Sequence, residues 1–233
     1  MNIGLFGYGK MGKMIERTAL GRNHTIVAKL DAESPQTDFT NWDVAIDFSQ
    51  PGAAFNNIAQ CMDHGVPIIS GTTGWLADYD KAVAHCHQKN GAFIYASNFS
   101  LGVNIFFELN EYLAKMMKPL EQYSVALEEI HHTQKLDAPS GTAISLAQGI
   151  IKHTHHTGWE LNGTEKGNIP IVAKRISEVP GTHIVEYGSA VDSLEIKHTA
   201  HNREGFALGA VIAAEWIVGK TGVFTMKDVL NLR

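Results

Sequence analysis

Short apolar segments alternate with longer amphipathic segments over the first 100 residues of the chain. The short segments predict buried strands and the amphipathic ones predict helices, an order typical of a parallel sheet covered by helices on both faces. Strands are expected within residues 2–6, 24–31, 42–51 (ending at Pro51), 66–74 and 92–100. Helices are expected to begin at residue 13 and to cover residues 53–65 and 76–90.

The pattern changes after Ser100. The segments of this second part are a long helix at 103–117, an alternating strand at 123–132, a helix entered through Pro139 and Ser140, a polar loop at 153–168, strands at 171–178, 182–189 and 192–200, and a last helix at 205–218. We therefore predict a nucleotide-type α/β half followed by an α+β half of mostly antiparallel strands. The last helix is expected to return to the first half.

Composition narrows the class of protein. The chain has 233 residues, 44% of them hydrophobic and 18% charged, which is ordinary for one large or two small globular domains. A net charge of −5 offers no basic field for nucleic acid or acidic lipid. Two cysteines give no disulfide framework, and no apolar stretch approaches the ~18 residues of a membrane span. Because the amino terminus also lacks a signal-peptide pattern, we expect a cytoplasmic protein without a nucleic-acid or membrane partner.

A glycine-rich motif joins the first predicted strand to the first helix, with the sequence Gly7-Tyr8-Gly9-Lys10-Met11-Gly12. In this G-x-G-x-x-G pattern the first glycine allows a tight turn, the second admits a pyrophosphate and the third permits close packing. Asp31 ends the second predicted strand, where an acid binds a ribose hydroxyl. Dinucleotide binding is the favoured interpretation, and a purely structural glycine turn is the alternative.

Two later turns follow predicted strands of the same sheet: Gly71-Thr72-Thr73-Gly74 and Ser97-Asn98-Phe99. Ligands of open parallel sheets lie beyond the carboxyl ends of the strands. We therefore expect both turns to contact the ligand, although each pattern also suits a plain turn.

Residues 128–143, EEIHHTQKLDAPSGTA, concentrate groups that carry protons or bind anions. His131 and His132 are adjacent on a predicted strand and would face opposite sides, so we do not expect them to share a metal or a role. One can donate a proton while the other binds substrate or packs. Lys135 follows, and Ser140-Gly141-Thr142 stands at a helix start, where free amides bind carboxylate or phosphate. A substrate with carboxylates explains this set, and a capped helix beside a polar strand is the structural alternative.

The remaining histidines point to no metal site. His153, His155 and His156 suit a solvated loop, and His85-Cys86-His87 would splay around a helix axis.

Taken together, these motifs resemble the dihydrodipicolinate reductases, also called 4-hydroxy-tetrahydrodipicolinate reductases, of bacterial and plant lysine biosynthesis. The most specific of them runs from Glu129 to Ala143, in the form E-x-HH-x-x-K-x-DAPSGTA. GYGKMG, IDFSQP, GTTG, SNFSLGVN and FTMKDVLNL occur in the order of that family, so the resemblance covers nearly the whole chain.

The resemblance implies a Rossmann-type parallel-sheet dinucleotide-binding domain plus an α+β substrate and oligomerisation domain with a mixed sheet. It places the dinucleotide-binding domain at residues 1–100, the substrate-binding and tetramerisation domain at 101–202, and a returning segment at 203–233. It further implies a homotetramer, NADH or NADPH as cofactor, and a small dicarboxylate substrate. The activity it implies is reduction of 4-hydroxy-tetrahydrodipicolinate to tetrahydrodipicolinate with loss of water.

Residue roles follow from matching positions. The resemblance implies His131 as proton donor, Lys135 as a second catalytic cation that binds substrate, and His132, Ser140, Gly141 and Thr142 as substrate contacts. The residues it assigns to the cofactor are Gly7, Tyr8, Gly9, Lys10, Met11, Gly12, Asp31, Gly71, Thr72, Thr73, Ala96, Ser97, Asn98, Phe99 and Arg203. The chain departs from the family pattern at Thr182, Thr199 and Asn202.

The cofactor preference is expected to favour NADH. A 2′-phosphate would lie against the carboxylate of Asp31, and Ala32 offers no guanidinium to compensate. Lys29 shares the face of Asp31 on a strand and would soften this repulsion only partly. Two rivals remain. Another two-domain dehydrogenase, acting on an amino acid or a semialdehyde, would not need the histidine, lysine and Ser-Gly-Thr set together, and a nucleotide-sensing module would leave His131 and Lys135 unexplained.

Overall fold

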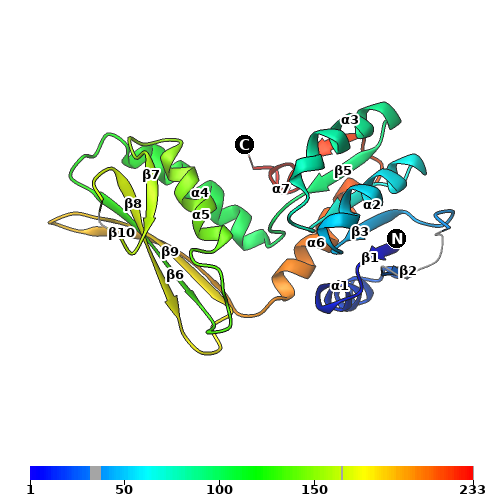
Figure 1. The fold of residues 1–233 in the computed structure, drawn as a ribbon, viewed down its shortest axis with the longest axis horizontal. Helices are drawn as coiled ribbons and strands as arrows, with labels where there is room; N and C mark the ends of the chain where they lie inside the picture. Colours follow the sequence, from blue (N-terminus) through cyan, green and yellow to red (C-terminus); the bar gives the residue numbers. More distant parts are fainter. Residues whose placement is uncertain (32–37, 164, 233) are drawn as a thin grey trace. The chain divides into compact units, whose positions relative to one another are not determined.

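The chain folds into two compact units (Figure 1). The computed structural model describes residues 1–31, 38–163 and 165–232. Unit 1 comprises Met1–Leu101 and Glu204–Arg233, and unit 2 comprises Gly102–Arg203. Among the described residues, no helix combines the length and the hydropathy that a bilayer crossing requires.

Unit 1 is built on a six-stranded parallel sheet with the strand order β11-β5-β4-β3-β1-β2. Its elements are β1 (Asn2–Phe6), α1 (Lys10–Gly21), β2 (Thr25–Leu30), β3 (Val44–Asp47), α2 (Pro51–Asp63), β4 (Ile68–Ser70), the 3-10 helix η1 (Leu76–Asp78), α3 (Tyr79–Lys89), β5 (Ala92–Tyr95), α6 (Glu204–Ile217), β11 (Gly222–Phe224) and α7 (Met226–Val229). Because β1 lies between β2 and β3, the strand order reverses at β1. The carboxyl ends of β1 and β3 therefore form the crevice where such sheets bind ligands.

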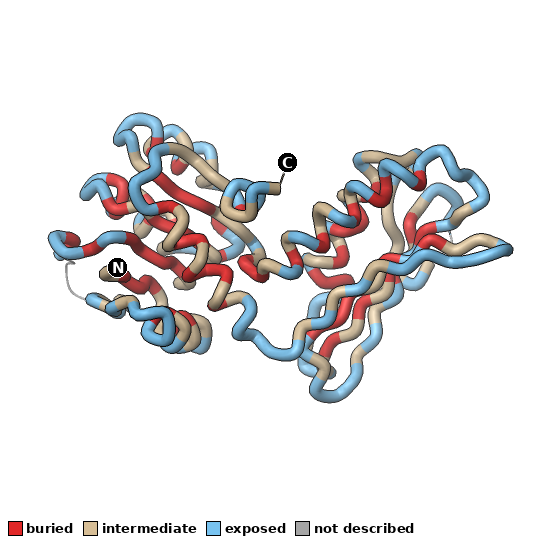
Figure 2. The backbone as a smooth tube through the Cα atoms, turned by 180° about the vertical axis from the view of Figure 1, so that it is seen from behind, coloured by how far each residue is buried: buried red, intermediate tan, exposed pale blue. Residues whose placement is uncertain are grey.

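Helices cover both faces of this sheet. Ile3 and Leu5 belong to a buried cluster that also contains residues of α1, α6 and α7, whereas Ile68 and Phe93 belong to a second cluster with residues of α2 and α3. Figure 2 shows long buried stretches, in red, in both units. Removing this apolar surface from water, at about 25 cal/mol per Å², holds the three layers together.

Unit 2 carries a five-stranded mixed sheet with the order β10-β9-β6-β8-β7, in which β6 runs parallel to β8 and antiparallel to β9. Its elements are β6 (Ser124–His131), α5 (Gly141–Ile151), β7 (Gly158–Leu161), β8 (Asn168–Arg175), β9 (Gly181–Gly188) and β10 (Ser193–Ala200), and α4 (Leu101–Met117) leads into it. Residues of α4 and α5 form one buried cluster with the sheet, including Phe106, Leu146 and Leu127. Asn110 donates a 2.9 Å hydrogen bond to the carbonyl of Leu146, which ties α4 to α5.

The predicted fold class is confirmed, with a Rossmann-type parallel sheet and a separate mixed sheet. Five expectations were wrong. The second sheet has two parallel and two antiparallel strand pairs rather than mostly antiparallel strands. The first helix begins at Lys10 rather than at residue 13, and the third strand ends at Asp47 rather than at Pro51, since Pro51 occupies the first turn of α2. Part of the expected loop at 153–168 forms β7, and the chain end contains β11 and α7, which the apolar pattern did not indicate.

Candidate active site

The glycines of the Gly7–Gly12 motif have different surroundings. Gly7 has a φ of +85°, and a Cβ there would lie 2.1 Å from the carbonyl oxygen of Phe48. A Cβ on Gly12 would lie 2.2 Å from the carbonyl oxygen of Gly7, whereas one on Gly9 would meet nothing within 4 Å among the described residues. The turn and the close packing thus need Gly7 and Gly12, and Gly9 leaves open space at the start of α1. Free amides at a helix start bind phosphate, so these residues fit a dinucleotide pyrophosphate.

The positive charge of Lys29 is compensated by the carboxylate of Glu16. Its Nζ lies 2.5 Å from Oε1 of Glu16, 3.2 Å from the hydroxyl of Tyr8 and 4.7 Å from the centre of the Tyr8 ring, and Tyr8 in turn donates a hydrogen bond to Glu16. The bond to Glu16, followed by that to Tyr8, raises the pKa of Lys29. The ammonium group is therefore already paired, which limits how far it can offset Asp31, an exposed residue directly after β2. Ala32, on which the preference argument also rests, lies outside the described residues.

A buried carboxylate joins the loops after β3 and β4. Asp47 is 0% exposed and accepts hydrogen bonds from the hydroxyls of Ser49, Ser70 and Thr72 at 2.6, 2.7 and 2.8 Å and from the amide of Asn57 at 3.0 Å. The hydroxyl of Thr72 also accepts the amide N–H of Ser49 at 2.9 Å. Thr72 thus shapes the loop through its side chain.

The remaining cofactor residues differ in exposure. Thr73 and Ser97 are exposed, and Ala96 and Asn98 are half-buried. Phe99 is 1% exposed and packs in the core with its ring 5.8 Å from that of Phe48, so only its backbone can reach a ligand. Arg203 is exposed, and Gly71 packs so tightly that a Cβ would lie 2.3 Å from the Phe48 ring.

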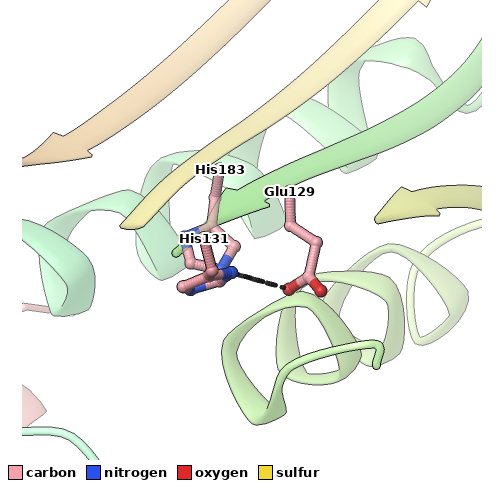
Figure 3. A group of neighbouring side chains, drawn as sticks. All are labelled: Glu129, His131 and His183. Atoms are coloured by element: carbon pink, nitrogen blue, oxygen red, sulfur yellow. Dashed lines mark ion pairs between the residues drawn. The ribbon is translucent and has the colours of Figure 1, made fainter. Parts of the chain in front are cut away.

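In unit 2, Glu129, His131 and His183 form a compact group (Figure 3). Residues two apart on a strand share a face, so β6 presents Glu129 and His131 together, and His183 stands opposite Glu129 on β9. Oε2 of Glu129 lies 3.5 Å from Nδ1 of His131 and 3.8 Å from Nε2 of His183. The two imidazole rings meet edge to face at 72°, with centres 5.0 Å apart.

Glu129 is fully buried but well paired. It accepts hydrogen bonds from the amide N–H of Ser140 at 2.9 Å and from Nη2 of Arg175 at 3.0 Å. Burial on its own raises the pKa of Glu129, but the bonds from Ser140 and Arg175 outweigh it and hold that pKa below its ordinary value. The carboxylate is therefore ionised, as a buried charge with two donors can be.

The two histidines are shifted toward their neutral forms. Burial lowers the pKa of His131, Glu129 opposes this, and the charges of Lys135 and Arg175 add to the lowering. Burial, with the charge of His131 as the second cause, lowers the pKa of His183 to about 4. His183 is thus neutral near pH 7, and its Nε2 lies 3.0 Å from Oγ of Ser140.

Arg175 also holds the segment that carries Lys135. Its Nη2 donates to the carbonyl of Asp137 at 2.6 Å and its Nε to the carbonyl of Lys135 at 3.3 Å. The ammonium group of Lys135 lies 2.8 Å from each carboxylate oxygen of Asp137. Nδ1 of half-buried His132 is buried and has no hydrogen-bond partner within the described chain.

The start of α5 has the geometry expected of an anion site. Ser140 caps the helix, since its Oγ accepts the amide N–H of Ala143 at 3.2 Å. Gly141 and Thr142 follow in the first turn, where backbone amides have no acceptor within the helix. Through Ser140 this helix start is bonded directly to Glu129 and His183.

The ring nitrogens and carboxylate oxygen of Glu129, His131 and His183 lie within 4.8 Å of one another, a spacing that can hold a metal ion. However, both oxygens of Glu129 already accept hydrogen bonds, and the guanidinium of Arg175 would repel a dication. The three side chains are better suited to accepting and donating protons than to binding a metal ion. That the site holds no metal stays a prediction.

A glycine-rich strand-to-helix turn on a doubly wound sheet, combined with a histidine, a lysine and a capped helix start on a second unit, is the arrangement expected of a two-domain oxidoreductase of the nicotinamide-dependent class. The model of the dihydrodipicolinate reductase N-terminus matches residues 1–99, and that of the dihydrodipicolinate reductase C-terminus matches residues 102–230. The chain therefore belongs to the dihydrodipicolinate reductase family.

Individual relatives agree with this assignment. A protein of Christiangramia forsetii named 4-hydroxy-tetrahydrodipicolinate reductase is 58% identical, over 99% of this chain and 98% of its own. One of the same name from Alkaliphilus metalliredigens is 36% identical over 96% of each chain. The dipicolinate-bound dihydrodipicolinate reductase of Paenisporosarcina sp. TG-14 shares the fold, with a TM-score of 0.81 at 23% identity over 100% of this chain and 99% of that chain.

Sequence reasoning left three residues of this network without a role. Glu129 lies within the signature stretch, whereas Arg175 and His183 come from β8 and β9. An acid two positions before a histidine on an alternating strand was the available signal for Glu129. No local pattern indicated Arg175 or His183, because their place depends on strand pairing.

Proposed function

We propose that the chain reduces 4-hydroxy-tetrahydrodipicolinate to tetrahydrodipicolinate, with loss of water, at the expense of NADH or NADPH. This is a step of lysine and diaminopimelate biosynthesis. The observation that carries the proposal is the placement of His131, Lys135 and the start of α5 around one buried network of Glu129, Ser140 and Arg175. The family assignment supplies the substrate's identity.

The reaction balances as substrate plus NAD(P)H plus a proton giving product, NAD(P)⁺ and water. When bound, the dinucleotide supplies the hydride. Loss of water leaves a conjugated C=C–C=N system, and hydride addition to it leaves an enamine that must gain a proton at carbon. The protein's part is to deliver that proton and to hold the substrate.

We assign the proton to His131. An imidazolium can release a proton near neutral pH, and in this step its N–H bond breaks as the new C–H bond forms. Lys135 is assigned to a substrate carboxylate and to the charge that develops beside it. Its ammonium group already binds the two oxygens of Asp137, the geometry that a substrate carboxylate would adopt in its place.

The second carboxylate is assigned to the start of α5 and to His132. The amides of Gly141 and Thr142 and the hydroxyl of Thr142 are the groups proposed to bind it, with Ser140 fixing the helix start. The family member from Paenisporosarcina carries dipicolinate, which is itself a dicarboxylate. That supports a dicarboxylate of similar size for this chain.

For the cofactor we propose Gly7–Gly12, Asp31, residues 71–73 and 96–99, and Arg203 as the contact set. NADH is the proposed preference. The supporting observation is that Lys29 is already paired with Glu16, so its ammonium group is less available to compensate a 2′-phosphate beside Asp31.

We also propose a cytoplasmic homotetramer assembled through the sheet of unit 2. The helices α4 and α5 share a core with one face of that sheet, whereas alternation places Ala126, Ile130 and Val172 on the opposite face. Two free buried cysteines suit a reducing compartment. Sedimentation of the purified chain at several concentrations tests the assembly, and a monomer at all of them contradicts it.

A coupled assay tests the activity. The aldolase-type condensation product of pyruvate and aspartate semialdehyde is generated in the cuvette, and NADH absorbance at 340 nm is followed. We expect decay only when that product forms. Decay with an amino acid or semialdehyde instead would favour a different dehydrogenase, and NADH binding without any turnover would favour a sensing module.

A further inference from the structure

We propose that Glu129 is a positioning residue for His131: its buried carboxylate faces Nδ1 of the ring, holds the proton there, and leaves Nε2 as the atom that delivers a proton to the substrate. The inference rests on the proposed role of His131 and extends it to a definite ring atom and a definite partner. It follows from the arrangement in Figure 3.

The orientation of the ring is the first support. Nδ1 of His131 is buried without a hydrogen-bond partner in the described chain, and Oε2 of Glu129 lies 3.5 Å from it. A small tightening of this pair would make it a charge-assisted hydrogen bond. Catalytic contacts are commonly long in the absence of ligands.

The other side of the ring is kept clear by a glycine. Gly181 is the first residue of β9, and a Cβ there would lie only 3.1 Å from Nε2 of His131. The absence of a side chain at this position leaves room beside Nε2. The two nitrogens therefore face different surroundings, a carboxylate at Nδ1 and a residue without a side chain at Nε2.

The charges around His131 show why this carboxylate matters. Lys135 on the following loop and Arg175 on β8 both disfavour a second positive charge, and burial disfavours it further. Glu129 on β6 and Asp137 on the loop act in the opposite sense, and neutral His183 on β9 carries no charge of its own. Glu129 is the fully buried one of the two acids and therefore the less screened.

Glu129 is also held so that it cannot turn away. The amide N–H of Ser140 binds Oε2 and the guanidinium of Arg175 binds Oε1. His183 stands edge-on against His131 and is anchored at Ser140. Because Ser140 is the cap of α5, the position of the proton donor is tied to the helix start proposed to bind the substrate carboxylate.

The first test is the pH profile of kcat/KM for Glu129→Gln in the full-length enzyme. A proton donor is active when protonated, so activity falls as pH rises through its titration. Removing the carboxylate should move this alkaline limb to lower pH by about 1–2 units, the usual effect of one adjacent charge. A substitution that merely perturbs packing would lower activity at every pH without moving the limb.

The matched control is Glu121→Gln. Glu121 is an exposed residue of the turn between α4 and β6, outside the candidate site and outside the sheet face proposed for assembly. Its profile should coincide with that of the unmodified enzyme. Coincident profiles for Glu129→Gln and Glu121→Gln would overturn the proposal.

The second test is made on the unmodified chain, and a variant serves only to assign the signal. Nitrogen-15 spectra of the unmodified full-length chain, titrated without ligands, report which nitrogen of neutral His131 carries the proton, and His131→Asn assigns the signal. We expect the proton on Nδ1, and a proton on Nε2 would overturn the proposal. Because this readout requires no turnover, it stands apart from the coupled assay, where failure would contradict the proposed function itself.

Discussion

His131 has to carry a proton in surroundings that favour its loss. The ring is 7% exposed, and burial lowers its pKa. A proton donor is most effective when its pKa lies near the working pH. The ionised Glu129 beside His131 raises the pKa of the ring and so offsets part of the lowering caused by burial. This balance separates His131 from the solvent-exposed histidines of the chain, such as His155.

Replacing His131 with alanine tests its role directly. We expect His131→Ala to lower turnover by roughly 10²–10⁴-fold, the usual scale of general acid catalysis, with little change in NADH affinity. His155→Ala is the control and should keep full activity. Steady-state rates and NADH titration by fluorescence give both quantities, and near-normal turnover in His131→Ala would refute the assignment.

His183 gives a pH dependence of stability rather than of activity. Its pKa is about 4 in the folded chain against 6.5 for an ordinary histidine, so between these values the unfolded chain binds a proton that the folded chain excludes. Stability is therefore complete above pH 6.5 and falls as pH drops toward 4, by up to about 3 kcal/mol.

Urea unfolding of the unmodified chain and of His183→Gln at several pH values from 7 to about 4 measures this loss. The variant should lose less stability on acidification, because the contribution of His183 is absent. The contributions of the other histidines whose pKa is lowered by burial, His131, His156 and His198, remain. Parallel pH dependences for the two proteins would contradict the prediction.

At the level of elements, the two ends of α1 offer a matched pair of glycines, Gly9 at its start and Gly21 at its end. A Cβ on Gly9 or on Gly21 meets nothing within 4 Å among the described residues, so both alanine variants should fold normally. Only Gly9 lies where a pyrophosphate would approach the backbone. We expect Gly9→Ala to weaken NADH binding by at least about tenfold and Gly21→Ala to leave it unchanged. Equal affinities in calorimetric titrations would remove Gly9 from the cofactor site.

The end of β2 sets the cofactor preference. A carboxylate at Asp31 favours two ribose hydroxyls over a 2′-phosphate, and we expect kcat/KM to be about five- to thirtyfold higher with NADH, equivalent to roughly 1–2 kcal/mol. Asp31→Ala should narrow this ratio. Equal values for the two cofactors in the unmodified enzyme, or a higher value for NADPH, would show the interpretation to be wrong.

The elements that the sequence predicted well have a clear local pattern of apolar residues. β1 is a short apolar run, β6 alternates between buried and more exposed positions, and α5 has helical spacing and a cap at Ser140. β11 and α7 are short segments whose stability comes from pairing with β5 and from the α6 side of the core, and β7 exists through its pairing with β8. A one-dimensional pattern carries little of that information.

The same distinction applies to the candidate site. The stretch from Glu129 to Thr142 is contiguous, so its histidines, its lysine and the helix start at Ser140 could be singled out from residue types, although Glu129 was given no role. Asp47, Arg175 and His183 reach their partners only through the register of neighbouring strands. These three residues carry charge or protons into buried positions, which sequence reasoning treats as unfavourable unless the partner is known.

At the scale of the whole molecule, the proposed site residues are divided between the two units. The proposed cofactor loops belong to unit 1, and His131 and Lys135 belong to unit 2. We expect binding of NADH and a dicarboxylate together to change the angle between the units, with hinges at residues 100–102 and 200–203, so that water is excluded during the reaction. Crystal structures with and without both ligands measure this angle. Superposition without any change would contradict closure.

Unit 1 is assembled from two stretches of chain that are separated by the whole of unit 2. The late stretch brings α6, whose Ala210, Ala214 and Ile217 are 0% exposed against one face of the first sheet, and it also brings β11. The amino-terminal part of a chain leaves the ribosome first. Residues 1–101 therefore emerge before residues 204–233, and until then one face of their sheet is covered only in part, by α1. Unit 2 is contiguous and can complete its core in this interval. Unit 1 therefore begins to be synthesised before unit 2 but completes its fold after unit 2. We expect the nascent chain to be most prone to aggregation between these two events.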